Sequence, residues 1–164
     1  MPLIDILSDG IFAAIAAIGF GAISDPPLRA FSSIALLAAI GHALRFCLMT
    51  YLGVDIATAS LCASFSIGMG SLLLGKRIYC PMTVLYIPAL LPMVPGMYAY
   101  KIVFSLIMFM QNLKVPELQQ KYMMEMCTNS VITCSVIFML AVGATIPLFL
   151  FKTRAFSMTR HKKY

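Results

Sequence analysis

The sequence predicts an all-α integral membrane protein with about five transmembrane helices, the fourth of which is broken by proline and glycine. Hydrophobic residues make up 61% of the 164-residue chain and charged residues only 11%, whereas about 25% of residues are charged in an ordinary soluble domain. Apolar runs close to the ~20 residues that cross a ~30 Å hydrocarbon layer recur along the chain. One of these runs contains a cluster of prolines. Because no stretch is left for a soluble domain, we expect residues 1–164 to form a single transmembrane domain.

The first three segments have the character of uninterrupted helices. Asp5 and Asp9 take the place of the basic region of a signal peptide, so the first segment is expected to remain as a spanning helix. In the third, Ser60, Ser64 and Gly68 recur every four residues and form a small-residue ridge that lets another helix approach closely. Packing within the chain is favoured over a dimer contact. The segments cover residues 3–23, 30–52 and 56–74.

The fourth segment, residues 78–110, cannot be one straight helix. A continuous helix of this length would reach about 50 Å, well beyond the bilayer core, and four prolines interrupt it. We expect it to be kinked, re-entrant or unwound near its middle. Its prolines are Pro81, Pro88, Pro92 and Pro95. The fifth segment is expected over residues 127–151, followed by a basic cytoplasmic tail at residues 152–164.

Basic residues in the connections predict the orientation. The net charge of +6 is concentrated in short connections and in the tail, which favours membrane lipids with anionic headgroups, and not nucleic acid, as the partner. The fourth connection balances its lysines with Glu117 and Glu125, so it lacks the basic excess that marks the cytoplasmic side. The chain is therefore expected in a bacterial inner membrane with its N-terminus outside and its C-terminus in the cytoplasm. The excess lies at Arg29, Lys76, Arg77, Lys152, Arg154, Arg160, Lys162 and Lys163.

No catalytic or metal-binding pattern accompanies the membrane segments. The sequence has no paired-carboxylate site, nucleophile motif, phosphate-binding loop or cofactor motif, so we expect no enzymatic activity and no cofactor. The five cysteines lie mostly inside apolar runs without ligand spacing, and we interpret them as small apolar side chains, not metal ligands. They are Cys47, Cys62, Cys80, Cys127 and Cys134.

Two polar residues of the second segment are candidates for substrate binding. His42 lies near its middle and Arg45 three residues on, so both project from one helix face. A central arginine costs ~2.5–3.5 kcal/mol on membrane-insertion scales and persists only beside partners, water or ligand. Asp9 is a candidate counter-ion for Arg45, and titration of His42 in such a network would couple a proton to transport. The alternative is that Arg45 extends to the interface and His42 bonds a neighbouring carbonyl.

The break in the fourth segment is a second candidate site. Pro92 and Pro95 remove amide donors and disfavour helix before them, and Gly96 permits backbone torsions closed to other residues. Unwound backbone at mid-depth is tolerated only where it lines protein or a water-filled cavity. The half-helix that follows presents free amides to carboxylates. A kinked packing helix with interfacial tyrosines is the alternative. The further candidate substrate-binding residues here are Tyr98, Tyr100 and Lys101.

Thr128 and Asn129 stand at the start of the predicted fifth helix. Their side chains are typical of a helix N-terminus, where they accept hydrogen bonds from free amides. Capping therefore explains them, and a role in substrate binding is the less favoured interpretation.

In these residues the chain resembles the small membrane subunit of the threonine/serine exporter family. The resemblance rests on Asp9, the run from Ala35 to Arg45, the stretch from Leu91 to Tyr100 and the Thr128-Asn129 pair, whose order and spacing cover nearly the whole chain. It implies about ten membrane segments, either fused in one chain or divided between two subunits of roughly five, and this chain resembles the second half. A second half that begins outside agrees with the orientation derived from charge.

The leading hypothesis is a secondary transporter subunit that works with a second membrane subunit of the same family in a hetero-oligomer. The resemblance implies export of threonine and serine, or of dicarboxylates such as succinate. Both cargo classes carry the carboxylate that the candidate residues would recognise, so the choice between them stays open. A non-transporting scaffold or assembly subunit, in which the polar residues only pair inside a complex, is the alternative.

Overall fold

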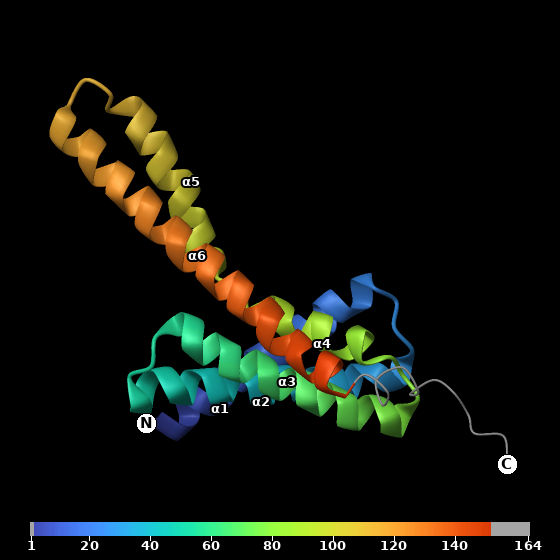
Figure 1. Ribbon diagram of the computed structural model, residues 1–164. Helices are drawn as coiled ribbons and strands as arrows, with labels where there is room; N and C mark the ends of the chain where they lie inside the picture. Colours follow the sequence, from blue (N-terminus) through green and yellow to red (C-terminus); the bar gives the residue numbers. More distant parts are fainter. Residues whose placement is uncertain (1, 152–164) are drawn as a thin grey trace, which may run out of the picture. The chain divides into compact units, whose positions relative to one another are not determined.

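The computed structural model describes residues 2–151, and all regular structure in this range is helical (Figure 1). The all-α membrane fold predicted from the sequence is confirmed. Within the described residues, four helices are long and apolar enough to cross a membrane, and a fifth span results if the two pieces of the broken segment count as one. The predicted basic tail, residues 152–164, lies outside the described residues.

The first three helices begin and end close to the predicted limits. They are α1 (Pro2–Ile23), α2 (Leu28–Leu52) and α3 (Ile56–Ile78). Gly53 ends α2 in the left-handed conformation with φ of 63°, which a residue without Cβ adopts freely. The Asp55 carboxylate caps α3 by accepting the Thr58 amide at 2.9 Å, and this hydrogen bond lowers the pKa of Asp55.

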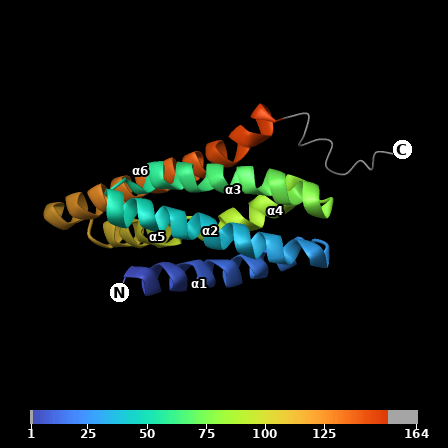
Figure 2. The ribbon, with the colours of Figure 1, turned by 90° about the horizontal axis from the view of Figure 1, so that it is seen from below.

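The described chain divides into two compact units. The first contains the residues up to Met93 together with α6 from Met139 onward, and the second contains residues 94–138. In the first unit, α2 packs against α1, α3 and α4, and Figure 2 shows α1, α2 and α3 lying along one another. Its core is apolar. Its largest fully buried side chains include Ile34, Ile67, Leu85 and Met93.

The small-residue ridge of α3 packs against the last part of α6, within the first unit. The Ser64 hydroxyl donates to the Met139 carbonyl at 3.3 Å, and a Cβ added at Gly143 would collide with that hydroxyl and with a backbone carbonyl of α3. A Cβ added at Gly68 would lie 2.8 Å from the Ala144 carbonyl oxygen. The ridge therefore serves packing within the chain, as predicted.

The fourth segment is broken, as predicted. It consists of α4 (Met82–Leu90), the 3₁₀ turn η1 (Leu91–Met93) and α5 (Gly96–Gln111). Pro92 lies in η1, and Pro95 occupies the position before α5, so the prolines mark both sides of the break. The explanation given for Gly96 was wrong: among the described residues only Gly53 is a glycine with positive φ. Gly96 therefore uses backbone torsions that other residues also adopt.

The last helix, α6 (Pro116–Leu150), begins well before the predicted fifth segment. Its apolar run starts near Cys127, but the preceding turns are also helical although they carry Glu117, Lys121 and Glu125. In the second unit, α5 and the first part of α6 run side by side as a hairpin joined by residues 112–115 (Figure 1). Because α6 starts at Pro116, Thr128 and Asn129 lie inside the helix, and the capping interpretation of these two residues was wrong.

Candidate functional site

The first unit holds a polar cluster made of Asp9, His42 and Arg45. His42 Nδ1 lies 3.1 Å from Asp9 Oδ2. The His42 side chain is 9% exposed, whereas the Asp9 side chain is 39% exposed. α1 approaches α2 closely here, because a Cβ added at Gly10 would be in ordinary van der Waals contact with the Ala39 carbonyl oxygen at 3.4 Å. Asp9 is thereby held beside the buried histidine.

The other ring nitrogen of His42 has no partner. His42 Nε2 is buried and makes no hydrogen bond with any residue that the structure describes, although the backbone of Pro92 lies close to the ring. Asp9 as an ionised carboxylate accepts a hydrogen bond from Nδ1–H, which leaves Nε2 as the acceptor nitrogen of the neutral ring. A buried polar atom without a partner costs about 1–3 kcal/mol. A proton or a ligand donor is what this nitrogen lacks.

Arg45 binds the broken segment directly. Its Nη1 donates to the Met93 carbonyl oxygen at 2.9 Å, at the end of the 3₁₀ turn where helical pairing stops. Within residues 2–151 no carboxylate lies within ion-pair distance of Arg45, so Asp9 contacts His42 and forms no ion pair with the guanidinium. A guanidinium has five N–H donors, of which the Met93 carbonyl takes one. The remaining donors are available to a carboxylate.

The close contact between α2 and η1 depends on Gly41. A Cβ at this position would lie 2.8 Å from the Met93 methyl carbon and would also collide with Ile67. Gly41 therefore lets η1 and α3 approach the helix that carries His42 and Arg45. Neither Gly41 nor Met93 was predicted from the sequence to shape the site, although Gly41 directly precedes the histidine.

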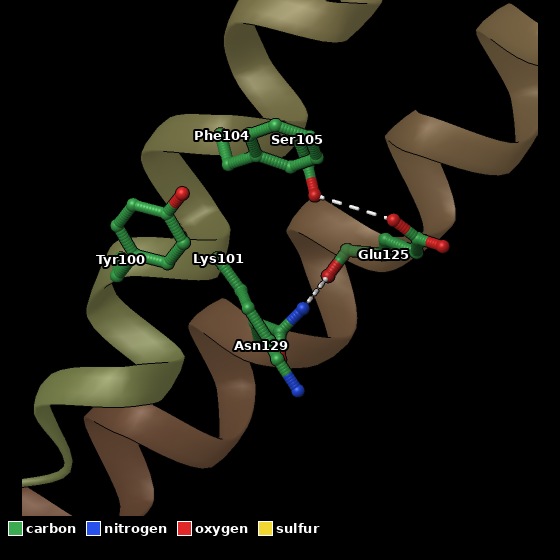
Figure 3. Close-up of a pocket in the computed structure, with 6 residues that line it drawn as sticks. All are labelled: Tyr100, Lys101, Phe104, Ser105, Glu125 and Asn129. Atoms are coloured by element: carbon green, nitrogen blue, oxygen red, sulfur yellow. Dashed lines mark hydrogen bonds between the residues drawn. The ribbon is translucent and has the colours of Figure 1, made fainter.

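The second unit contains an open pocket of about 450 Å³ between α5 and α6 (Figure 3). The Asn129 amide nitrogen donates to the Glu125 carbonyl oxygen at 2.7 Å, and the buried Ser105 hydroxyl faces the Glu125 carboxylate at 3.5 Å. The rings of Tyr100 and Phe104 stack with centroids 6.2 Å apart. The residues that line the pocket are Tyr100, Lys101, Phe104, Ser105, Glu125 and Asn129.

Three of these lining residues were predicted from the sequence and three were not. Tyr100, Lys101 and Asn129 were candidates, while Phe104, Ser105 and Glu125 were missed. A signal was available, because Lys101 and Ser105 are four residues apart on one helix, as are Glu125 and Asn129 on the other. The pocket is not lined by Tyr98, whose ring lies 5.8 Å from the Lys101 ammonium, or by the exposed Thr128.

Several apolar helices of spanning length, one of them broken where Arg45 binds the backbone, define a polytopic α-helical membrane protein. The family model described as Threonine/Serine exporter, ThrE, matches residues 9–150 of the chain. The match covers most of the 164 residues. The chain belongs to the threonine/serine exporter family, as the resemblance in its motifs implied. No solved structure matches the chain.

Proposed function

We propose that this chain is one subunit of a secondary transporter that exports small carboxylate-bearing metabolites. It works with a second membrane subunit of the same family in a bacterial inner membrane, with its N-terminus outside and its C-terminus in the cytoplasm. Threonine and serine are the cargo that the family indicates, and succinate-like dicarboxylates are the second class with the same recognisable group. The family is one of transporters, and no enzymatic step is part of the proposal.

The observation that carries this proposal is the contact of Arg45 with the broken segment. The guanidinium is half-buried, uses one donor on the Met93 carbonyl and has no carboxylate partner among the described residues. An arginine placed in this way binds carboxylates through two parallel hydrogen bonds. Half-buried cations in spanning helices are retained where they serve a substrate pathway. We propose that the cargo carboxylate binds at Arg45.

His42 and Asp9 adjust the charge of this site. With neutral His42, the carboxylate of Asp9 offsets the charge of Arg45, and a proton on His42 adds a positive charge beside the bound carboxylate. The Asp9 hydrogen bond fixes the ring so that Nε2 remains the open position. Proton binding and cargo binding are thereby linked. Because the sequence has no phosphate-binding loop, an ion or substrate gradient drives export.

The test is efflux of threonine, serine and succinate from cells that express the chain with its partner subunit. Arg45→Ala removes both the charge and the Met93 contact, whereas Arg45→Gln retains a donor for the carbonyl but no charge. We expect both substitutions to lower efflux about 10-fold or more, since a hydrogen bond to a charged group contributes about 1.5–3 kcal/mol.

The matched control is Arg29→Gln, the same change at an exposed arginine, which leaves efflux unaltered. Membrane insertion and partner binding are measured for every variant. Normal efflux in both Arg45 variants would contradict the proposal and would favour the alternative, a scaffold subunit that does not transport.

A further inference from the structure

The α5–α6 pocket is lined by one positively charged and one negatively charged side chain, Lys101 and Glu125, which do not form an ion pair with each other. Within the described residues no carboxylate lies within ion-pair distance of the Lys101 ammonium, which instead lies 5.8 Å from the Tyr98 ring centroid. Among the described residues, the Glu125 carboxylate receives one hydrogen bond, the long one from Ser105. In Figure 3 the Lys101 side chain extends toward Asn129, whereas the Glu125 carboxylate points toward Ser105. The two charges stand at different ends of one pocket.

The surroundings of these charges fit a ligand better than a structural ion pair. Lys101 and Glu125 lie on facing helices of one hairpin, and a volume of about 450 Å³ adjoins both of them, within the ~300–1,000 Å³ of small-molecule sites. Asn129 donates one of its two amide hydrogens to the Glu125 backbone carbonyl. Its second amide hydrogen and its side-chain oxygen can still form hydrogen bonds with a ligand. The stacked rings of Tyr100 and Phe104 offer an apolar wall.

The pocket also lies where an aqueous ligand can reach it. Glu125 belongs to the charged first turns of α6, and the apolar run of that helix begins only at Cys127. Glu125 is therefore expected near the membrane interface, where charges cost far less than at the bilayer centre, and the pocket reaches from there along α5 to Lys101. With the predicted orientation, this interface is the outer one.

We propose that this pocket is a binding site for a small zwitterion, separate from the polar cluster at Arg45. The ligand carboxylate binds the Lys101 ammonium and the free Asn129 amide hydrogen, and the ligand ammonium binds the Glu125 carboxylate. A dicarboxylate meets like charge at Glu125 and is excluded. An α-amino acid with a short side chain carries both groups, and it places the side chain against Tyr100 and Phe104.

Equilibrium dialysis with three matched ligands tests this inference. The full chain is purified from its membrane, together with any co-purifying subunit, and placed in nanodiscs. L-threonine carries both charges, L-threoninol lacks the carboxylate, and 3-hydroxybutyrate lacks the ammonium group. We expect threonine to bind at least 10-fold more tightly than either analogue. Lys101→Gln should abolish the preference over threoninol, and Glu125→Gln should abolish the preference over 3-hydroxybutyrate.

Lys114→Gln and Glu117→Gln, identical changes at exposed positions of the same hairpin, should preserve both preferences. The measurements are repeated in the Arg45→Gln chain, so that the polar cluster cannot supply the signal. Threonine binding that is unchanged in both pocket variants, equal weakening of all three ligands, or no binding by the unmodified chain would each overturn the inference. The efflux result for Arg45 stands in all of these outcomes, so the two proposals fail separately.

Discussion

The two ring nitrogens of His42 differ in their hydrogen bonding. Its Nδ1 is held by Asp9 from α1, while its Nε2 is buried and unpartnered among the described residues. Arg45 from the same helix and the backbone of Pro92 from η1 complete its polar surroundings, and α3 and α4 add no titratable group that acts on it in the described structure. Since such an atom is unfavourable in a resting protein, we interpret it as the position that a proton or ligand occupies during transport.

Replacement of His42 by glutamine should remove the pH dependence of transport. Glutamine can keep a hydrogen bond to Asp9 but does not titrate, whereas histidine ordinarily titrates near pH 6.5. Protonation adds a positive charge beside Arg45, so the apparent KM of the unmodified transporter for a carboxylate should fall as the pH falls from about 7 to about 5. His42→Gln should show a constant KM over this range. Efflux rates at several cargo concentrations and pH values measure this, and parallel pH profiles for the two proteins would refute it.

The sequence was sufficient to find the polar residues of α2 but not the partner of each. A spacing of three residues places His42 and Arg45 on one face of α2 whatever the rest of the fold does. The partner of Asp9 depends on the register between α1 and α2, which helical periodicity does not determine. Glu125 was used only in the count of loop charges, because its position opposite Lys101 requires knowledge of the hairpin.

At the scale of the elements, helix breaks were easier to predict than helix starts. Pro92 and Pro95 interrupt the fourth segment through their missing donors, which is a local effect. The start of α6 was missed because the fifth segment was delimited by apolarity, whereas the charged first turns of α6 are also helical. Pro116 followed by Glu117 was a usable signal, since proline and acidic residues favour the first turn of a helix.

The α3–α6 contact should be intolerant of a single added methyl group. In Gly143→Ala the new Cβ meets the Ser64 hydroxyl and the backbone of α3, and overpacking of this kind costs about 1–3 kcal/mol. Gly19→Ala is the matched control, because Gly19 is a helical glycine with nothing within 4 Å of an added Cβ. Its substitution should be neutral or stabilising by about 0.4–1 kcal/mol.

Thermal unfolding in detergent compares the two alanine variants with the unmodified chain. Because the chain has no tryptophan, unfolding is followed with a thiol-reactive fluorescent dye or by light scattering. We expect a lower midpoint for Gly143→Ala than for the unmodified chain and no decrease for Gly19→Ala. Equal midpoints in all three proteins would show that the two helices do not pack at Gly143.

At the scale of the whole molecule, the orientation in the membrane decides which face the hairpin tip reaches. The basic excess at Lys76 and Arg77 predicts that the α3–α4 connection lies in the cytoplasm, and we then expect the connection at residues 112–115 outside. In a cysteine-free background, Lys114→Cys should react with a membrane-impermeant maleimide in intact cells. Lys76→Cys should react only after permeabilisation. The reverse pattern would invert the orientation and place the zwitterion pocket at the cytoplasmic surface.

The broken fourth segment has a consequence for how the protein is made. At 1.5 Å per residue, α5 with its 16 residues is about 24 Å long, and α4 with its nine residues is shorter still. Neither piece covers the ~30 Å hydrocarbon layer alone. We therefore expect the two pieces to enter the bilayer together as one broken span. Because α4 packs on α1, α2 and α3, which precede it in the chain, its packing surface is synthesised before it.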